Sequence, residues 1–81
     1  MRITIRLFGR LRDMAGAAEL QRDLPEAATV GTAWELLAAE FPPIAPYARS
    51  VSAAVNADFA KMSARLAKDD DVAFLPPVSG G

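Results

Sequence analysis

Apolar and polar residues alternate along two stretches near the start of the chain. In residues 1–8 the apolar side chains fall on one side of an extended backbone, at Met1, Ile3, Ile5 and Leu7. A period of two over this length predicts a half-buried strand. Residues 18–24 alternate in the same way, so we expect a second strand that forms a long-looped hairpin with the first. Residues 10–16 then make a short connection, with Leu11 and Met14 pointing inward.

A single apolar stripe with helical spacing follows. Its members, at i, i+3, i+4, i+7, i+8 and i+11, are Val30, Ala33, Trp34, Leu37, Ala38 and Phe41. Thr29 is the candidate N-cap, with Thr32 and Glu35 as an alternative capping box one turn later. Pro42 and Pro43 end the helix. We expect Trp34 to pack the stripe against the sheet, with stacking on a ligand as the alternative.

The second half of the chain predicts three more strands. They are a strand over 51–55, a short edge strand over 59–62 and a last strand over 72–75. An irregular crossing over 44–50 precedes them, Asn56 to Asp58 has the composition of a tight turn, and an acidic turn occupies 68–71. Pro76 and Pro77 end the last strand because proline cannot donate to a ladder.

The order strand, strand, helix, strand, short strand, strand predicts a single α+β domain over residues 1–81. One main helix covers one face of a mixed sheet of four to five strands. With the first two strands as a hairpin and the last strand in the middle, this is a β-grasp (ubiquitin-like) roll. The order alone also allows other small α+β rolls. We expect residues 76–81 to form a flexible tail.

Composition removes many kinds of chemistry. The 81 residues include no cysteine and no histidine, which excludes disulfides, thiol nucleophiles, the usual zinc sites and the commonest general base. The net charge of −1 argues against a dedicated nucleic-acid binder. No segment is apolar over the length of a membrane span, and nothing resembles a signal peptide, so we expect a cytoplasmic protein.

Two clusters of charge leave alternatives open. Four arginines near the start, Arg2, Arg6, Arg10 and Arg12, predict a solvated strand face and loop, with a phosphate-binding patch or a docking area for an acidic partner as alternatives. Asp69, Asp70 and Asp71 predict a solvated turn, because three consecutive side chains do not converge easily on one cation. We therefore expect no metal site, no bound cofactor and no self-sufficient catalytic set.

The remaining candidate for chemistry is the carboxyl end, Ser79-Gly80-Gly81. Pro76 and Pro77 stiffen the exit from the last strand, and two glycines without a Cβ make a slim peptide that fits a narrow channel. A terminal carboxylate is a poor electrophile and needs activation, for example by adenylation. The chain has no machinery for that step, so an ATP-using partner would supply it. A frayed tail without a role is the alternative.

The ending Val72-Ala73-Phe74-Leu75-Pro76-Pro77-Val78-Ser79-Gly80-Gly81 resembles the signature of the molybdopterin synthase small-subunit (MoaD) family. The stretches Phe8 to Arg12, Thr29-Val30 and Ala54 to Asn56 are similar to family motifs too, so the resemblance covers nearly the whole chain. One departure is Lys68-Asp69-Asp70, where the family commonly has an Asp-Gly-Asp type turn. Aspartate tolerates left-handed dihedrals at some cost, so we expect the turn to survive.

The resemblance implies a β-grasp sulfur carrier. An E1-like adenylyltransferase similar to MoeB would adenylate Gly81, which then becomes a thiocarboxylate. Inside a MoaE-like large subunit it would give sulfur to cyclic pyranopterin monophosphate, in a heterotetramer with two large subunits. Gly80 would permit threading, and Ser79, Val78, Pro77 and Pro76 would guide the tail.

The resemblance also implies a partner-facing surface at Phe8, Phe59 and Leu75, with plain strand or core packing as the alternative. Two other functions share the same Gly-Gly chemistry. One is sulfur carriage for thiamine, tRNA thiolation or cysteine synthesis, and the other is a ubiquitin-like modifier joined to lysines through Gly81. A binding module whose tail does nothing is the remaining alternative.

Overall fold

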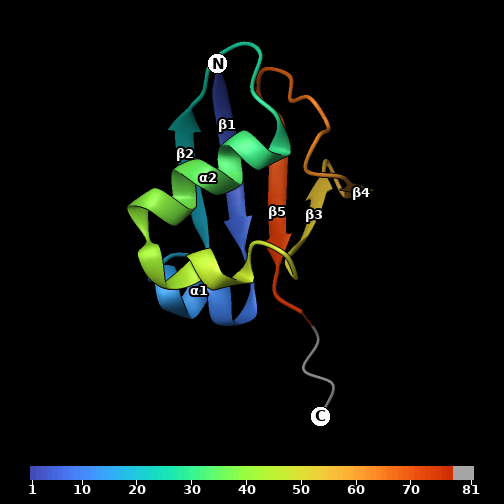
Figure 1. Ribbon diagram of the computed structural model, residues 1–81. Coiled ribbons are helices and arrows are strands. Elements are labelled where there is room, and N and C mark those ends of the chain that lie inside the picture. The colour runs from blue at the N-terminus through green and yellow to red at the C-terminus, as the bar shows by residue number, and fades with distance from the viewer. Residues whose placement is uncertain (78–81) are drawn as a thin grey trace.

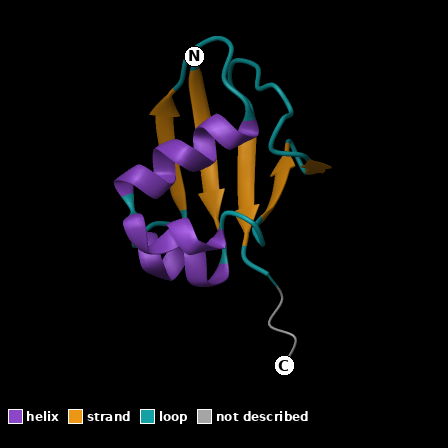
Figure 2. Cartoon of the chain, viewed as in Figure 1, coloured by secondary structure: helices purple, strands orange, loops and turns teal. Residues whose placement is uncertain are grey.

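The computed structural model describes residues 1–77. Its strands are β1 (Arg2–Leu7), β2 (Glu19–Asp23), β3 (Ser52–Val55), β4 (Asp58–Ala60) and β5 (Asp71–Leu75). Its helices are α1 (Gly9–Ala15), α2 (Val30–Glu40) and a 3-10 helix, η1 (Pro42–Tyr47). Figure 1 shows α2 crossing one face of the sheet in front of β2, β1 and β5, with β3 and β4 to the side. The layers of helix and sheet are separated by colour in Figure 2.

The five strands form one mixed sheet in the order β2-β1-β5-β3-β4. β1 pairs antiparallel with β2 and parallel with β5, while β3 pairs antiparallel with both β5 and β4. The last strand therefore lies in the middle, beside the first, as the sequence predicts for a β-grasp roll. The sheet has five strands and one main helix on one face, so the predicted fold class is confirmed.

The alternating strands and the helical stripe share one core. Ile3, Ile5 and Leu7 of β1 are at most 1% exposed, and Val72 and Phe74 of β5 are fully buried. From α2 the buried residues are Val30, Ala33, Trp34 and Leu37, whereas Ala38 and Phe41 are partly buried at the edge of the core. Because one face of each element is apolar, a two-layer packing removes both faces from water.

Helix α2 begins where the sequence predicts. Oγ1 of Thr29 accepts a hydrogen bond from the N–H of Thr32 at 3.2 Å, and Oγ1 of Thr32 accepts one from the N–H of Thr29 at 3.0 Å. This reciprocal pair is a capping box with threonine at its third position. The alternative start at Thr32 and Glu35 is wrong, because Val30 already lies in the first turn.

Three local expectations need correction. Met14 is 38% exposed, since α1 lies at one end of the sheet and only Leu11 reaches the core. The crossing after α2 is not irregular, because residues 42–47 form the 3-10 helix η1 with Ile44 buried. β4 ends at Ala60 rather than at residue 62.

The two tight turns carry left-handed backbone. Asn56 and Ala57 join β3 to β4 with φ of 50° and 75°, which suits a two-residue hairpin. Asp69 has a φ of 67° in the turn before β5, and its N–H bonds the carbonyl of Arg2 at 2.9 Å. Aspartate therefore takes the left-handed position here, as we expected. Within residues 1–77, no helix is long and apolar enough to cross a membrane.

Candidate functional site

The base of the tail lies where β5 leaves the sheet. Leu75 makes the last ladder pair, with Ser52 of β3, and the strand ends there because Pro76 has no N–H to donate. Pro76 is half-buried and Pro77 is exposed. The other predicted tail residues, Val78, Ser79, Gly80 and Gly81, lie outside the described part of the chain.

The face of the sheet opposite α2 has a floor of small residues. Alternation along β5 turns Val72 and Phe74 toward the helix, so Ala73 lies on the open face. The register then forms a row across the sheet, in which Arg6 pairs with Ala73, Ala73 with Ala54, and Ala54 with Phe59. The two alanines in the middle of this row have short, apolar side chains, so the open face is shallow and apolar there. We call this row, with Phe8 and Leu75 beside it, the open-face surface.

Hollows flank the alanine floor. One, of about 470 Å³, lies at the β1–β5 side and is lined by Arg6, Phe8, Asn56, Ala57, Asp71 and Ala73. Another, of about 360 Å³, lies at the β3–β4 edge and is lined by Phe59 together with residues that pack toward the core, Val51, Ala53, Ala60 and Met62. Phe8 is 44% exposed and Phe59 is 84% exposed, while Leu75 is half-buried. Of the three predicted interface residues, Phe8 lines the first hollow and Phe59 the second, while Leu75 lines neither, and their role stays a prediction.

Arg6 is the charged centre of the open face. Its Nε donates to Oδ2 of Asp71 at 2.7 Å, and its Nη1 donates to Oε1 of Glu19 at 2.7 Å. The hydrogen bond with Asp71, followed by the attraction of both carboxylates, raises the pKa of Arg6 above its usual value. The positive charge of Arg6 is therefore balanced by two carboxylates of the same chain. These ion pairs join β1 to β5 and to β2 on the open face.

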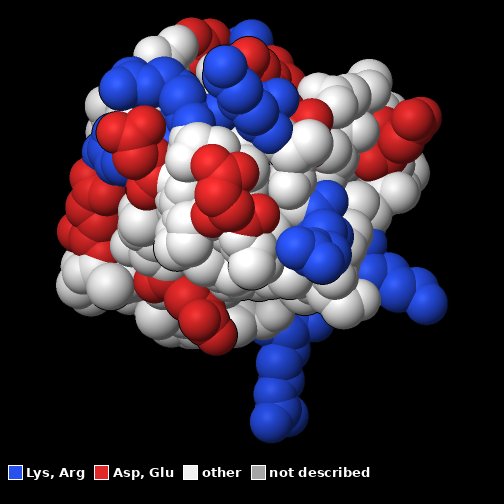
Figure 3. Space-filling view, turned by 90° about the horizontal axis from the view of Figure 1, so that it is seen from above, with Lys and Arg blue, Asp and Glu red and all other residues white. Residues whose placement is uncertain are grey.

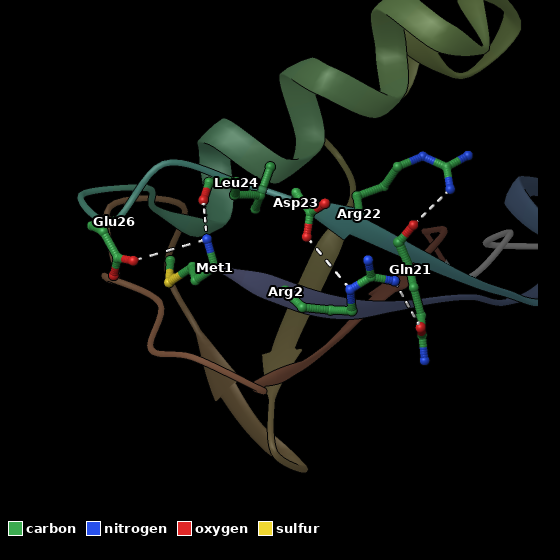
Figure 4. A network of polar contacts seen from close by, with 7 residues as sticks. All are labelled: Met1, Arg2, Gln21, Arg22, Asp23, Leu24 and Glu26. Carbon is green, nitrogen blue, oxygen red and sulfur yellow. Dashed lines mark hydrogen bonds and ion pairs between the residues drawn. The ribbon is translucent and has the colours of Figure 1, made fainter.

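The other arginines near the start do not assemble a single patch. Arg2 donates to the side chain of Gln21 at 3.2 Å and pairs with Asp23 at 3.4 Å (Figure 4). Arg10 and Arg12 belong to α1 and are exposed. The face viewed in Figure 3 shows acidic and basic side chains interspersed. The prediction of a solvated strand face holds for Arg2 and Arg6, since both are paired with carboxylates.

The acidic turn is held by its own hydrogen bonds. Oδ2 of Asp70 accepts from the N–H of Ala67 at 2.7 Å, and its Oδ1 accepts from Nδ2 of Asn56 at 2.9 Å. Asp71 is the first residue of β5 and faces Arg6. In the part of the chain that the structure describes, no group of three or more acidic residues is arranged to hold a metal ion.

The sequence profile of the ThiS family matches residues 5–81, which is nearly the whole chain. The chain belongs to the ThiS family. Membership fits the geometry, because residues 1–77 form a small domain that offers an open sheet face beside the start of the carboxyl-terminal tail.

Relatives of this ThiS-family chain are named for different functions. A molybdopterin synthase sulfur carrier subunit from Arabidopsis thaliana is 30% identical over 79 residues, covering 98% of this chain and 82% of the relative. A putative molybdopterin converting factor subunit 1 from Pyrococcus furiosus is 27% identical, with a TM-score of 0.86 over 96% of this chain and 99% of the other. SAMP1, small archaeal modifier protein 1, from Haloferax volcanii is also 27% identical, with a TM-score of 0.88 over 100% of both chains.

The ThiS-family match sets the class of function but not the pathway. At that level the chain is a sulfur carrier or a ubiquitin-like modifier. Reasoning from the sequence missed the alanine floor at positions 54 and 73 and the pairing of Arg6 with Asp71. The alternation of Val72 to Leu75 already marked Ala73 as facing away from the helix, whereas the ion pair joins residues 65 positions apart and had no local signal.

Proposed function

We propose that the chain is the sulfur-carrying small subunit of a molybdopterin synthase. The observation that carries the proposal is the 30% identity, over 98% of the chain, to a relative named as that subunit. The carboxylate of Gly81 attacks the α-phosphate of ATP in an activating partner, which releases pyrophosphate and leaves an acyl-adenylate. A sulfur nucleophile then displaces AMP, and Gly81 ends as a thiocarboxylate that donates its sulfur to cyclic pyranopterin monophosphate.

The described residues support a carrier rather than a free-standing enzyme. The one buried cluster is apolar, and no polar or charged residue within residues 1–77 is buried. Arg6, the charged centre of the open face, is paired with both Asp71 and Glu19. In this proposal the chain supplies the carboxylate, ATP is used by the partner, and no cofactor is bound. Pro76 to Gly80 guide the reactive end.

The open-face surface is the proposed docking site for partners. An aromatic side chain as exposed as Phe59, beside a floor of alanines, is typical of an interaction surface. We assign it to a MoaE-like large subunit and to a MoeB-like adenylyltransferase in turn, since both must receive the same tail. Two small subunits on a large-subunit dimer complete the proposed heterotetramer, in the cytoplasm.

A second function has its own support. The match to SAMP1, which is named a modifier protein, covers both chains completely. The fold of this chain therefore also suits a modifier that is joined to lysines through Gly81. Sulfur carriage for another pathway uses the same activation. These functions differ in the acceptor, which is the pterin, the sulfur acceptor of another pathway, or a lysine.

The decisive experiment is a capture from native extract that leaves Gly81 free. A tag at the amino end is unsuitable, because the amino group of Met1 is partly buried and donates to the carbonyl of Leu24 at 2.6 Å (Figure 4). Glu26 is 89% exposed and lies 4.0 Å from the amino group of Met1, at the start of β1 (Figure 4). Because β5 runs parallel to β1 and ends just before Pro76, Glu26 is at the other end of the sheet, and Glu26→Cys gives the chain one thiol for coupling to a resin. A matched resin carries the same variant without Gly80 and Gly81.

The proposal requires that the intact resin retain a molybdopterin synthase large subunit and an adenylyltransferase. In a purified mixture, ATP and a sulfur donor must exchange one oxygen of Gly81 for sulfur, as measured by intact mass. Sulfur must then pass to the pterin, and none must pass in the truncated control. Isopeptide links from Gly81 to many lysines, with no transfer to the pterin, would replace the proposal with the modifier. Recovery of a thiazole synthase would move the chain to another sulfur pathway.

A further inference from the structure

Gly9 and Pro76 touch at the point where the chain leaves the sheet. Gly9 opens α1 with a φ of 53°, and a Cβ added to it would lie 3.0 Å from Cγ of Pro76 and 3.7 Å from Cδ. Cβ atoms seldom come that close to another carbon, so one of the two residues would have to move. Because Gly9 has no Cβ, the ring of Pro76 can pack directly against its Cα.

Gly9 is the fixed side of this contact. Leu7 and Leu11, two positions before and after it, are anchored in the core, since Leu7 is 1% exposed and Leu11 is fully buried. The carbonyl of Phe8 accepts hydrogen bonds from the N–H groups of Leu11 at 3.1 Å and Arg12 at 3.4 Å, which closes the turn. Strain introduced at this contact would thus be relieved on the side of Pro76.

Pro76 is the side that can yield. Leu75 makes the last pair of the ladder, and the N–H of Phe8 bonds the carbonyl of Phe74 at 3.3 Å, so the backbone is held up to this point. Pro76 itself has no N–H, and its ring atoms are tied to its backbone nitrogen. A push on Cγ consequently moves the backbone of Pro76 and changes the direction in which the following residues leave.

We propose that Gly9 is a positioning residue for sulfur transfer, because it sets the direction in which the chain leaves β5. The expected effect of Gly9 on the rate of sulfur transfer rests on the proposed function, whereas its effect on the direction of the chain does not. Pro76 and Pro77 restrict φ and keep that direction over two residues. A fully extended chain from Pro76 to Gly81 spans about 17 Å, so a tilt of about 10° at Pro76 displaces its end by about 3 Å. A misplacement of about 1 Å can cost about 100-fold in rate.

The chain contains a matched control for this contact. Gly16, at the end of α1, also has a left-handed φ, of 72°, but a Cβ added there meets nothing within 4 Å. Gly9→Ala and Gly16→Ala therefore impose a similar backbone strain, and only the first pushes on Pro76. A third variant, Pro76→Ala, removes the ring from the contact and leaves Gly9 unchanged.

A spin label tests the direction of the tail without any partner. The chain has no cysteine, so Ser79→Cys carries a nitroxide at one site, and the broadening of amide signals in the domain maps where the label lies. We expect Gly9→Ala to change the pattern of broadening and Gly16→Ala to leave it as in the parent. If Gly9→Ala does not fold, Pro76→Ala must change the pattern. If Gly9→Ala folds and its broadening pattern is unchanged, the inference is overturned. If Gly9→Ala does not fold, an unchanged broadening pattern in Pro76→Ala overturns it.

The transfer rate tests the consequence. With the Gly81 thiocarboxylate prepared chemically, the adenylation step is bypassed. We expect Gly9→Ala to lower kcat at least tenfold with KM for the carrier unchanged, and Gly16→Ala to match the parent. In the Pro76→Ala background, Gly9→Ala should have no further effect. Equal rates for the parent and Gly9→Ala, or equal losses in both glycine variants, overturn the inference. A parent that transfers no sulfur refutes the proposed function instead, and the label pattern still decides whether Gly9 directs the tail.

Discussion

The ring of Trp34 meets the ring of Phe74 edge-on, with 5.1 Å between the centroids and 64° between the planes. Trp34 comes from α2 and Phe74 from β5, so this contact joins the helical layer to the strand that leads into the tail. Edge-to-face pairs of this kind are worth about 0.5–1.5 kcal/mol beyond the area that they bury. The same contact therefore stabilises the domain and fixes the end of β5.

We predict that Trp34→Ala and Leu37→Ala each lower the free energy of unfolding by about 2–5 kcal/mol. Trp34 is 4% exposed and Leu37 is fully buried, so each replacement leaves a cavity in the core. Urea unfolding followed by circular dichroism measures the change. Glu35→Ala, on the exposed side of the same helix, is the control and should change the value by less than about 0.5 kcal/mol. A loss below about 1 kcal/mol for Trp34→Ala would contradict the packing described.

The regular elements could be predicted because their signal is local and periodic. The alternation of Ile3, Ile5 and Leu7 and the stripe through Trp34 and Leu37 each show which face is apolar, and a two-layer domain follows from burying both. The middle position of β5 was expected as part of the β-grasp arrangement, and the pairing of β5 with both β1 and β3 confirms it.

The site could be predicted only in part, because its contacts are not local. Nothing near Gly9 in the sequence indicates that Pro76 lies against it, and the pairing of Arg6 with Asp71 depends on the parallel register of β1 and β5. Met14 shows the opposite failure. Its spacing from Leu11 suits a buried helical face, but α1 lies beyond the end of the sheet and leaves Met14 38% exposed.

We predict that glycine at either left-handed turn position stabilises the fold. Ala57 and Asp69 have φ of 75° and 67°, and L-residues pay about 1–2 kcal/mol for this region. Glycine removes that strain, but it also raises the conformational entropy of the unfolded chain, which offsets part of the stabilisation. Ala57→Gly and Asp69→Gly should therefore each raise the free energy of unfolding by up to about 1 kcal/mol. Thermal unfolding under identical conditions measures both.

A third glycine variant separates the two terms. Ala67 is exposed and is not among the positive-φ residues, so Ala67→Gly gains no relief of strain and should lower stability by about 0.4–1 kcal/mol. A loss of stability in Ala57→Gly as large as in Ala67→Gly would show that the turn is not strained.

We predict that an ion pair between strand and helix contributes to stability above acidic pH. The guanidinium of Arg22 on β2 contacts both carboxylate oxygens of Glu40 at the end of α2. The hydrogen bond from Arg22 lowers the pKa of Glu40 in the folded protein below the usual value of 4.5 for a glutamate. A folded pKa below the unfolded one means that the contribution is present above pH 4.5 and is lost as pH falls through the folded pKa.

The test compares the parent with Glu40→Gln from pH 7 down to pH 3. The parent should be more stable near neutral pH by about 0–1 kcal/mol, as for other exposed pairs, and the difference should shrink as the carboxylate protonates. Glu35→Gln is the control, because Glu35 makes no ion pair within residues 1–77. A difference that grows on acidification would have the wrong sign.

We predict that Phe59→Ala weakens partner binding while leaving the domain stable. Phe59 is 84% exposed on the edge strand β4, so its removal should change the free energy of unfolding by less than about 0.5 kcal/mol. As an aromatic anchor on the open-face surface, it should cost at least about 1 kcal/mol, or fivefold in Kd, for the large subunit. Titration calorimetry gives the affinity. Met14→Ala truncates an exposed apolar residue on α1 and should bind as the parent does.

We predict that one residue added after Gly81 abolishes sulfur transfer without changing the fold. In the proposed reaction the group that is adenylated is the carboxyl group of Gly81, and an extra residue converts that carboxyl into an unreactive amide. Gly80→Val should also block transfer, since a β-branched side chain widens the tail and restricts its backbone. Melting temperatures should stay at the parent's value, because neither change touches the core.

The measurement is transfer of radiolabelled sulfur to the pterin, with intact mass recorded for every sample. Removal of the added residue by a carboxypeptidase should restore the rate, which separates blockage from damage. Gly80→Ala is the graded control, because a single methyl group widens the tail less than valine does. Parent-like transfer from a chain whose mass still includes the extra residue would show that the carboxyl group of Gly81 is not the atom that carries sulfur.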